Sequence, residues 1–387
     1  MSGEDTCQRG RSLLPRPCKG INNITNIFSI LHQEIANPHS CARAGIYNSQ
    51  KLNNKMPKEK ILTSELVSDI NRVGNQSVLQ WFTENQIKIG SKGNIFDTLE
   101  NALQTNEISV LQIKEAIAEL EENSNKKVLL YKAGSFEVLR QSKTSILKKL
   151  HKEDGITAST VNWQLGTPKE APTFVYMFWE EDIIKIKYIE KQYEVEADFE
   201  NEKFIKVPKT VCILYIIDTN DGFTQIRFDN AYTIHRHKNE EGKSTDGAYE
   251  QFYISHLQKL FSDINFTELD LNGVANYISN EEKTRFRLNK GVATVTNGAK
   301  QTYATATIKA DVRDLPEYAG AAAKTIEVWR AEDLTGYWLA SEAEGKLNRD
   351  LFMRISRRQS QIRVQRGCFE KELNYGIEQI RKIQGRI

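Results

Sequence analysis

Apolar residues between positions 61 and 124 recur every three or four residues, which is the spacing of one face of an α-helix. The first stripe runs from Leu62 to Val73, and Thr63 and Ser64 are candidate N-cap residues for it. Three more stripes of this kind follow before residue 121. Four short helices predict a compact helical bundle, to which we assign residues 56–132 together with a short apolar strand at 126–131.

From residue 160 onward the pattern changes to an alternation of apolar and polar positions, which is typical of half-buried strands. The alternation begins around Val161 and Trp163. Three β-prone segments follow at 173–187, 210–218 and 222–228, and the connections between them are too short for crossover helices. We therefore predict an antiparallel meander.

The C-terminal part mixes both periods. Helices are predicted at 247–261, 267–278 and 369–384, and strands at 284–289, 292–297, 301–312 and 325–329. Hairpin turns are predicted at 289–291 and 297–298, between the first three of these strands. A terminal hairpin is predicted from strands at 351–355 and 361–365. The predicted fold class is α+β: a small N-terminal helical bundle, then an antiparallel β-rich domain with inserted helices and a C-terminal helix.

The predicted domain borders follow from composition. Residues 1–55 are rich in Arg, Asn, Ser and Pro without a sustained period, which indicates a disordered arm or a non-native segment ahead of Met56. Residues 133–159 are helical and rich in lysine and read as a basic connector. Residues 160–387 form the β-rich domain.

Bulk composition excludes several classes of protein. The chain of 387 residues is 39% hydrophobic and 27% charged, as is ordinary for a globular protein, and its longest apolar run, 211–217, is too short to cross a bilayer. Its five cysteines are scattered without a CxxC pair, which favours a reducing compartment over a disulfide framework, and Cys212 is expected to be buried in a strand. We expect a cytoplasmic or nucleoid-associated location and no membrane partner.

A basic run near the C-terminus carries the main functional signal. The net charge of the chain is only +2, yet one stretch contains a single acid, Asp350, among seven cations: Lys346, Arg349, Arg354, Arg357, Arg358, Arg363 and Arg366. In a hairpin, Ile355, Ile362 and Val364 would face one side and arginines the other.

Arginine suits phosphate because its planar fork donates two parallel hydrogen bonds. We therefore predict a nucleic-acid-binding protein that contacts the phosphate backbone of DNA or RNA through Arg354, Arg357, Arg358, Arg363 and Arg366. Two alternatives stay open: an acidic surface, internal or on a protein partner, and a solvated face that only adds solubility.

A second basic site is predicted on the helical block. The stretch from Gln86 through Lys88 and Lys92 to Leu99 resembles the turn and second helix of SAP-type DNA-binding modules, in which a helix N-terminus faces phosphate. The alternative is a pair of packed helices without a ligand.

The order of elements over about residues 62–235 resembles the centromere protein N family. The resemblance rests on a small helical bundle, the strand Val161-Asn-Trp163-Gln-Leu-Gly166 and the aromatic strand from Pro172 to Trp179. It implies binding to DNA or a nucleoprotein surface without enzyme activity, and it transfers no individual binding residue.

Evidence for catalysis is sparse, so we assign no catalytic residue, metal ligand or cofactor. His235 and His237 would share one side of a strand but have no further ligands nearby. Glu180, Glu181 and Asp182 with Lys185 and Lys187 have the residue types of a metal-dependent nuclease without its spacing, so a divergent nuclease is a further alternative. Aromatic residues of the predicted sheet are expected to be core rather than a base-stacking surface.

Overall fold

The computed structural model describes residues 60–134, 139, 148, 169–198, 203–229, 248–294, 300–318, 330–356, 360–365 and 367–386. The predicted arm 1–55, the strand around Trp163 and the candidate strand 325–329 lie outside the described residues. Nearly all of the predicted connector 133–159 lies outside them as well.

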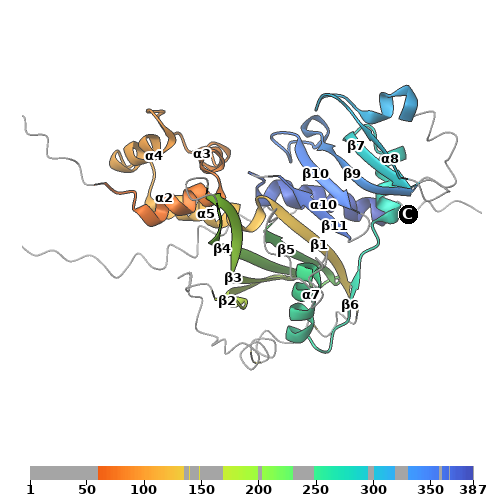
Figure 1. Cartoon of the computed structure of the whole chain (residues 1–387), viewed down its shortest axis with the longest axis horizontal. Helices are drawn as coiled ribbons and strands as arrows, with labels where there is room; N and C mark the ends of the chain where they lie inside the picture. The colour runs from red at the N-terminus through yellow and green to blue at the C-terminus, as the bar shows by residue number, and fades with distance from the viewer. Residues whose placement is uncertain are drawn as a thin grey trace, which may run out of the picture. The chain divides into compact units, whose positions relative to one another are not determined.

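Four helices occupy the first described segment: α2 (Ser64–Val73), α3 (Asn75–Glu84), α4 (Ile95–Gln104) and α5 (Val110–Asn123) (Figure 1). Side chains cap three of them, because Thr63, Asn94 and Ser109 each accept hydrogen bonds from backbone amides of the first turn. Their apolar stripes share one core, which includes Ile70 and Leu99.

The strands of the described residues form one eleven-stranded sheet in which every pairing is antiparallel. They are β1 (Lys126–Ala133), β2 (Thr173–Glu180), β3 (Ile183–Asp198), β4 (Lys203–Asp218), β5 (Phe223–Asp229), β6 (Phe266–Glu268), β7 (Phe286–Thr294), β8 (Lys300–Ala304), β9 (Arg330–Trp338), β10 (Leu351–Ser356) and β11 (Gln361–Val364). Their order is β2-β3-β4-β5-β1-β11-β10-β9-β7-β8, with β6 also paired to β1. The mixed α+β class and the meander β2–β5 are confirmed.

Two local predictions are corrected. The strand at 126–131, which we grouped with the helices, is β1, and it lies in the middle of the sheet between β5 and β11. The hairpin turn predicted at 289–291 is absent, because β7 continues through it with a register shift between Leu288 and Lys290. Asn289 lies at this bulge, and its side-chain amide donates to the Thr307 and Ala310 carbonyls.

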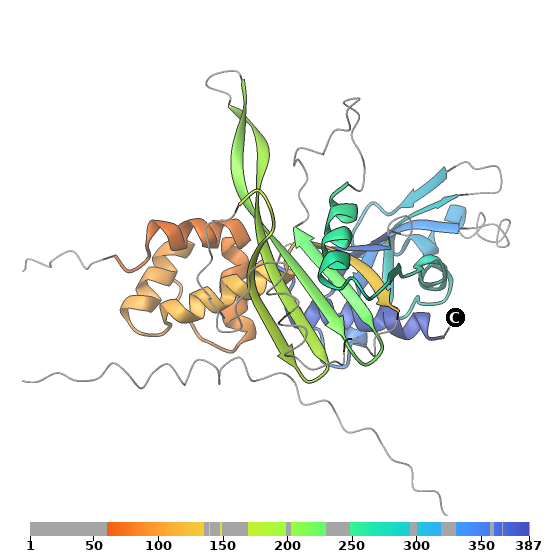
Figure 2. The ribbon, with the colours of Figure 1, turned by 90° about the horizontal axis from the view of Figure 1, so that it is seen from below.

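The helices on the two faces of the sheet cover different strands (Figure 2). Helix α10 (Glu370–Gln384) and helix α8 (Asn272–Asn280) pack on one face and share a core with strands β7, β9, β10 and β11. Helix α7 (Ala248–Leu260) packs on the opposite face, over β3, β4 and β5. No described residue of β10 or β11 belongs to the core under α7, although Glu250 of α7 reaches the side of β11 that points away from α10 and accepts there from Gln361.

Buried charges join helix α5 to the sheet. The Glu121 carboxylate accepts from Lys187 of β3 at 2.6 Å and from Arg72 of α2 at 2.7 Å. The side chains of Glu121 and Lys187 are each only 4% exposed. Burial alone would raise the pKa of Glu121, but the charges of Lys187, Arg72 and Lys126 lower it to about 2. Glu121 therefore remains ionised in the folded protein down to strongly acidic pH.

We expect Glu121→Gln to destabilise the fold by about 3 kcal/mol at neutral pH, because it leaves Lys187 buried with weaker compensation. The folded-state pKa of Glu121 lies below its ordinary value of 4.5. Its contribution is therefore complete above pH 4.5 and is lost as the pH falls toward 2. Urea unfolding at several pH values should show the difference between wild type and variant shrinking over that interval.

The double variant Glu121→Leu/Lys187→Met is the matched control. Removing both partners leaves no isolated charge of this pair, so it should be less destabilised than the single variant. If Glu121→Gln lowers the free energy of unfolding only slightly and equally at every pH, the Glu121 ion pairs do not hold α5 against the sheet.

Candidate nucleic-acid interface

The predicted terminal hairpin is present, and its two faces differ as expected. Strands β10 and β11 pair with Arg354 opposite Arg363 and Ile355 opposite Ile362. Ile355 and Ile362 are buried in the core shared with α10. Arg354 and Arg363 therefore project from the other face of the hairpin. The other predicted contacts of this run, Arg357, Arg358 and Arg366, lie outside the described residues.

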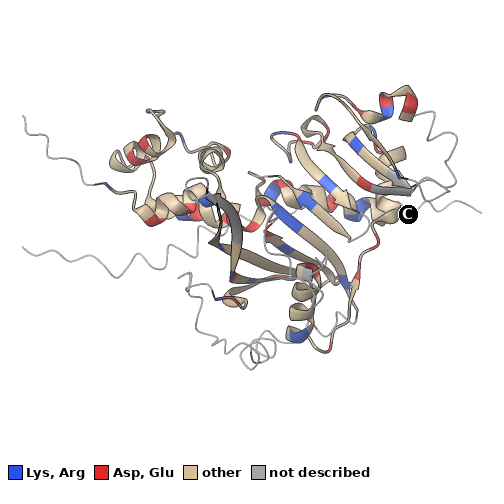
Figure 3. Cartoon of the chain, in the orientation of Figure 1, with Lys and Arg blue, Asp and Glu red and all other residues tan. Residues whose placement is uncertain are grey.

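The two arginines belong to a longer row of cations across the sheet. Lys127 of β1 lies opposite Arg363 of β11, which lies opposite Arg354 of β10. On the next two strands, Arg354 lies opposite Thr335 of β9, and Thr335 lies opposite Lys290 of β7. We call Lys127, Arg363, Arg354 and Lys290 the cation row. Because these residues are paired across neighbouring strands, the row crosses the sheet at right angles to its strands, which are about 4.8 Å apart. Figure 3 shows lysine and arginine positions on β1, β11, β10 and β7.

Some charge of the row is balanced within the fold. Arg354 pairs with Asp333 at 2.9 Å, and its side chain is still 41% exposed. Lys127 pairs with Glu250 of α7 at 2.9 Å and is largely covered. Arg363 donates to the Gln361 side chain, whereas Lys290 is exposed and forms no ion pair with a described residue. Arg354 and Lys290 are thus the cations of the row whose exposure leaves them accessible.

An aromatic pair lies beside the cation row on the same face. Phe352 of β10 lies opposite Tyr337 of β9, and Tyr337 lies opposite Arg287 of β7. The two rings meet edge to face with centroids 5.3 Å apart. The Arg287 guanidinium lies 5.1 Å from the Tyr337 ring centroid and pairs with Asp350 at 2.8 Å. Both rings are half-buried, and neither is part of a hydrophobic core cluster of the described residues.

The first two cations of the basic run are internal contacts instead. Arg349 pairs with Glu372 of α10, donates to Gln80 of α3, and lies over the Phe369 ring. Burial alone would lower the pKa of Arg349, but Glu372 outweighs this effect and the pKa is raised. Lys346 lies 3.5 Å from Glu378 of α10. For these two residues, the alternative of an internal acidic surface fits the structure.

The lysines of the helical block lie in the segment between α3 and α4. Lys88 and Lys92 are both exposed, and the Lys92 ammonium donates to Asn101 of α4. The first amides of α4 are already capped by the Asn94 side chain, and Asp97 adds a negative charge to the first turn. An anion at this helix start would compete with both groups.

The residues considered for catalysis have other contacts. The Asp182 carboxylate accepts from Asn220, Lys185 pairs with Glu370, and Lys187 is buried against Glu121. This placement gives the nuclease hypothesis no support. His235 and His237 lie outside the described residues, within which no cluster of three or more His, Cys, Asp or Glu side chains has the arrangement of a metal site.

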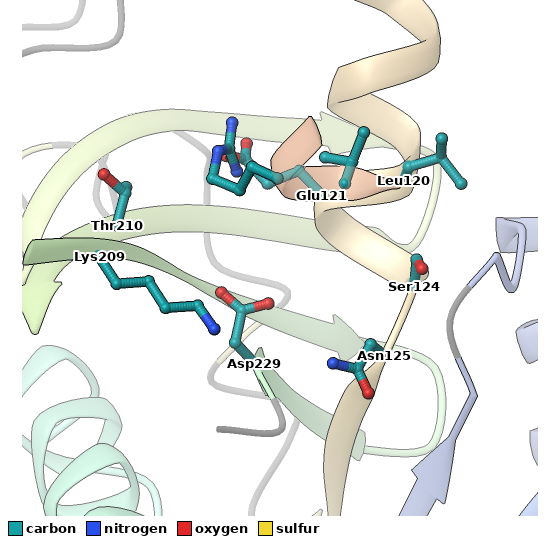
Figure 4. A pocket seen from close by; sticks show the side chains of 9 residues that line it. Leu120, Glu121, Ser124, Asn125, Lys209, Thr210 and Asp229 are labelled. Atoms are coloured by element: carbon teal, nitrogen blue, oxygen red, sulfur yellow. The ribbon is translucent and has the colours of Figure 1, made fainter. Parts of the chain in front are cut away.

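One small cavity adjoins the buried ion pairs of α5 (Figure 4). It has a volume of about 60 Å³ and is lined by Arg72, Val73, Leu120, Glu121, Ser124, Asn125, Lys209, Thr210 and Asp229. Asp229 pairs with Lys126 on one side and accepts from the Cys212 amide on the other. This volume has room for a few water molecules, so the cavity fits a hydrated ionic network.

Other sequence expectations on buried groups hold. Cys212 is 1% exposed, and burial raises the pKa of its thiol to about 12. Tyr188 and Tyr215 of the predicted aromatic sheet are fully buried, as expected for core residues, whereas Phe174, Phe178 and Trp179 are half-buried. In the described part of the chain, no helix is both long and apolar enough to cross a membrane.

Comparison with known proteins adds no family to this picture. No protein-family model matches the chain, and no curated protein matches it either. The resemblance to centromere protein N therefore stays a prediction.

Sequence reasoning missed Lys127, Lys290, Arg287, Tyr337 and Phe352 as parts of this face. One signal was present, since Phe352 and Arg354 alternate with Met353 and must share a side of their strand. The others join the face only through pairing between distant segments.

The face depends on close contact between β7 and β9 at Gly336. A Cβ atom at Gly336 would lie 2.2 Å from the Arg287 carbonyl oxygen and 2.5 Å from the Phe286 ring. We expect Gly336→Ala to destabilise the protein by about 2 kcal/mol or more, measured by urea unfolding.

Gly291 of the same strand pair is the control, because a Cβ atom there meets only ordinary contacts at 3.8 Å and beyond. Gly291→Ala should be tolerated. Equal stability of the two variants would show that β7 and β9 are not as closely packed as described.

Proposed function

We propose that the chain binds nucleic acid without chemical turnover, through contacts of the cation row with the phosphate backbone. The observation that carries this proposal is the direct pairing of Arg354 with Arg363 within a row that continues to Lys290. Like charges directly opposite each other in a sheet are destabilising. Asp333 offsets this repulsion at Arg354 in the free protein, and a polyanion laid along the row would add to that compensation.

Exposure and residue type support the proposal. Arg354 keeps 41% of its side chain accessible despite its ion pair with Asp333. Arginine can bind a phosphate with two parallel hydrogen bonds, which an ammonium cannot do. Because the phosphate is common to both polymers, the proposal covers DNA and RNA alike.

The remaining predicted contacts, Arg357, Arg358 and Arg366, lie outside the described residues. In the sequence, Arg357 and Arg358 directly follow β10, and Arg366 is the second residue after β11. We include them as further candidate phosphate contacts. Lys88 and Lys92, on the helical block that we treat as a small bundle, are candidates for a second, weaker contact.

An acidic protein surface is a second candidate partner. The ion pairs of Arg354 with Asp333 and of Arg287 with Asp350 are examples of carboxylates bound on this face. Such a partner would use the same cations, so a direct test with nucleic acid distinguishes the two.

We expect Arg354→Ala/Arg363→Ala to weaken binding of the full chain to labelled oligonucleotides at low salt. Binding would be measured by fluorescence anisotropy in about 50 to 200 mM salt. The negative slope of log affinity against log salt should become shallower by roughly 1.5, since each phosphate contact contributes about −0.7 to −0.9 to that slope.

The control Lys382→Ala/Arg386→Ala also removes two cations, but from the exposed side and end of α10. It should leave both affinity and slope unchanged. Equal losses in the two variants would point to nonspecific attraction, and no binding by the wild type would refute the proposal.

A further inference from the structure

We propose that the nucleic acid is single-stranded and that its bases stack against Phe352, Tyr337 and Arg287. This inference rests on the proposed function, because it concerns the same face of the sheet. In this proposal the stacking residues contact the bases, whereas the cation row contacts the phosphates.

The aromatic pair and the cation row lie at a spacing that suits one nucleotide. Phe352 precedes Arg354 by two residues on β10, and Tyr337 follows Thr335 by two residues on β9. Two residues of a strand span about 7 Å, and side chains two apart lie on the same face. A nucleotide whose phosphate contacts Arg354 can therefore direct its base toward Phe352.

The aromatic pair is fixed in position. Tyr337 is held between the Phe352 ring, at 5.3 Å, and the Arg287 guanidinium, at 5.1 Å. Asp350 anchors Arg287 and also accepts from the Ala340 amide. A stacking surface that is already ordered loses little conformational entropy when a ligand binds.

The burial of the pair points to an outward role. Neighbouring side chains on the other face, such as Met353 and Trp338, are fully buried in the core under α10 and α8. Phe352 and Tyr337 keep part of their surface accessible and contact no core cluster among the described residues.

Stacking selects for unpaired bases. In a duplex the base faces are occupied by their neighbours, so only a single strand offers them to a protein. Aromatic rings and guanidinium planes both stack on bases, and every base has such a face, so we expect little sequence preference.

The test uses the full chain and three probes: a single-stranded oligonucleotide, its duplex, and a single strand of the same length with abasic sugars. Wild type should bind the single strand most tightly and the abasic strand clearly less. Tyr337→Leu/Phe352→Leu should lose about tenfold or more of its affinity for the single strand, with little change for the other two probes.

Two further variants make the result specific. Phe252→Leu removes an exposed ring from α7, where Phe252 is 44% exposed, and should change nothing. Tyr337→Trp/Phe352→Trp keeps flat rings at both positions and should retain binding of the single strand, which separates stacking from a purely structural role of the pair.

The outcomes separate this inference from the proposed function. Equal affinity for all three probes, lost only with Arg354→Ala/Arg363→Ala, would overturn stacking and leave the phosphate contact standing. Unchanged single-strand affinity in Tyr337→Leu/Phe352→Leu would also overturn it. Absence of binding to every probe would overturn both.

Discussion

The central position of β1 is the constraint on which the rest of the structure depends. It pairs with β5 on one side and β11 on the other, so among the described strands it is the one whose pairing joins the N-terminal meander to the C-terminal strands. It also follows α5 directly in the chain, and the buried pair of Glu121 with Lys187 holds that helix against β3. Displacing β1 would separate the two halves of the sheet and break the cation row at Lys127.

The fold uses its charges in two physically different ways. Glu121 and Lys187 are withdrawn from water, where removing one partner leaves a costly isolated charge. Arg354 with Asp333 is an exposed pair of the kind that contributes little to stability. Arg349 is an intermediate case, since it joins Glu372 and Gln80 within the fold but its side chain is 32% exposed. A run of like charge in sequence therefore contains both structural and surface residues.

Local patterns predicted local structure well. The alternation around Ile355 and Ile362 predicted the hairpin and its apolar face, because strand geometry fixes which neighbours share a side. The place of β1 in the sheet and the alignment of Lys290 with Arg354 depend on pairing between distant segments, which no local pattern encodes. The false hairpin at 289–291 arose because Asn-Lys-Gly is also compatible with a bulge. The burial of Glu121 was missed because its partners lie on α2 and β3.

The pairing of β1 with β11 raises the contact order of the protein, because the two strands are separated by more than half of the chain. During synthesis, β1 leaves the ribosome long before its second neighbour exists. Until the C-terminal strands are made, one edge of β1 lacks this neighbour, and such edges are prone to pair with other chains. Lys126 and Lys127 lie at the start of β1, and charged side chains on an unpaired strand edge disfavour that association.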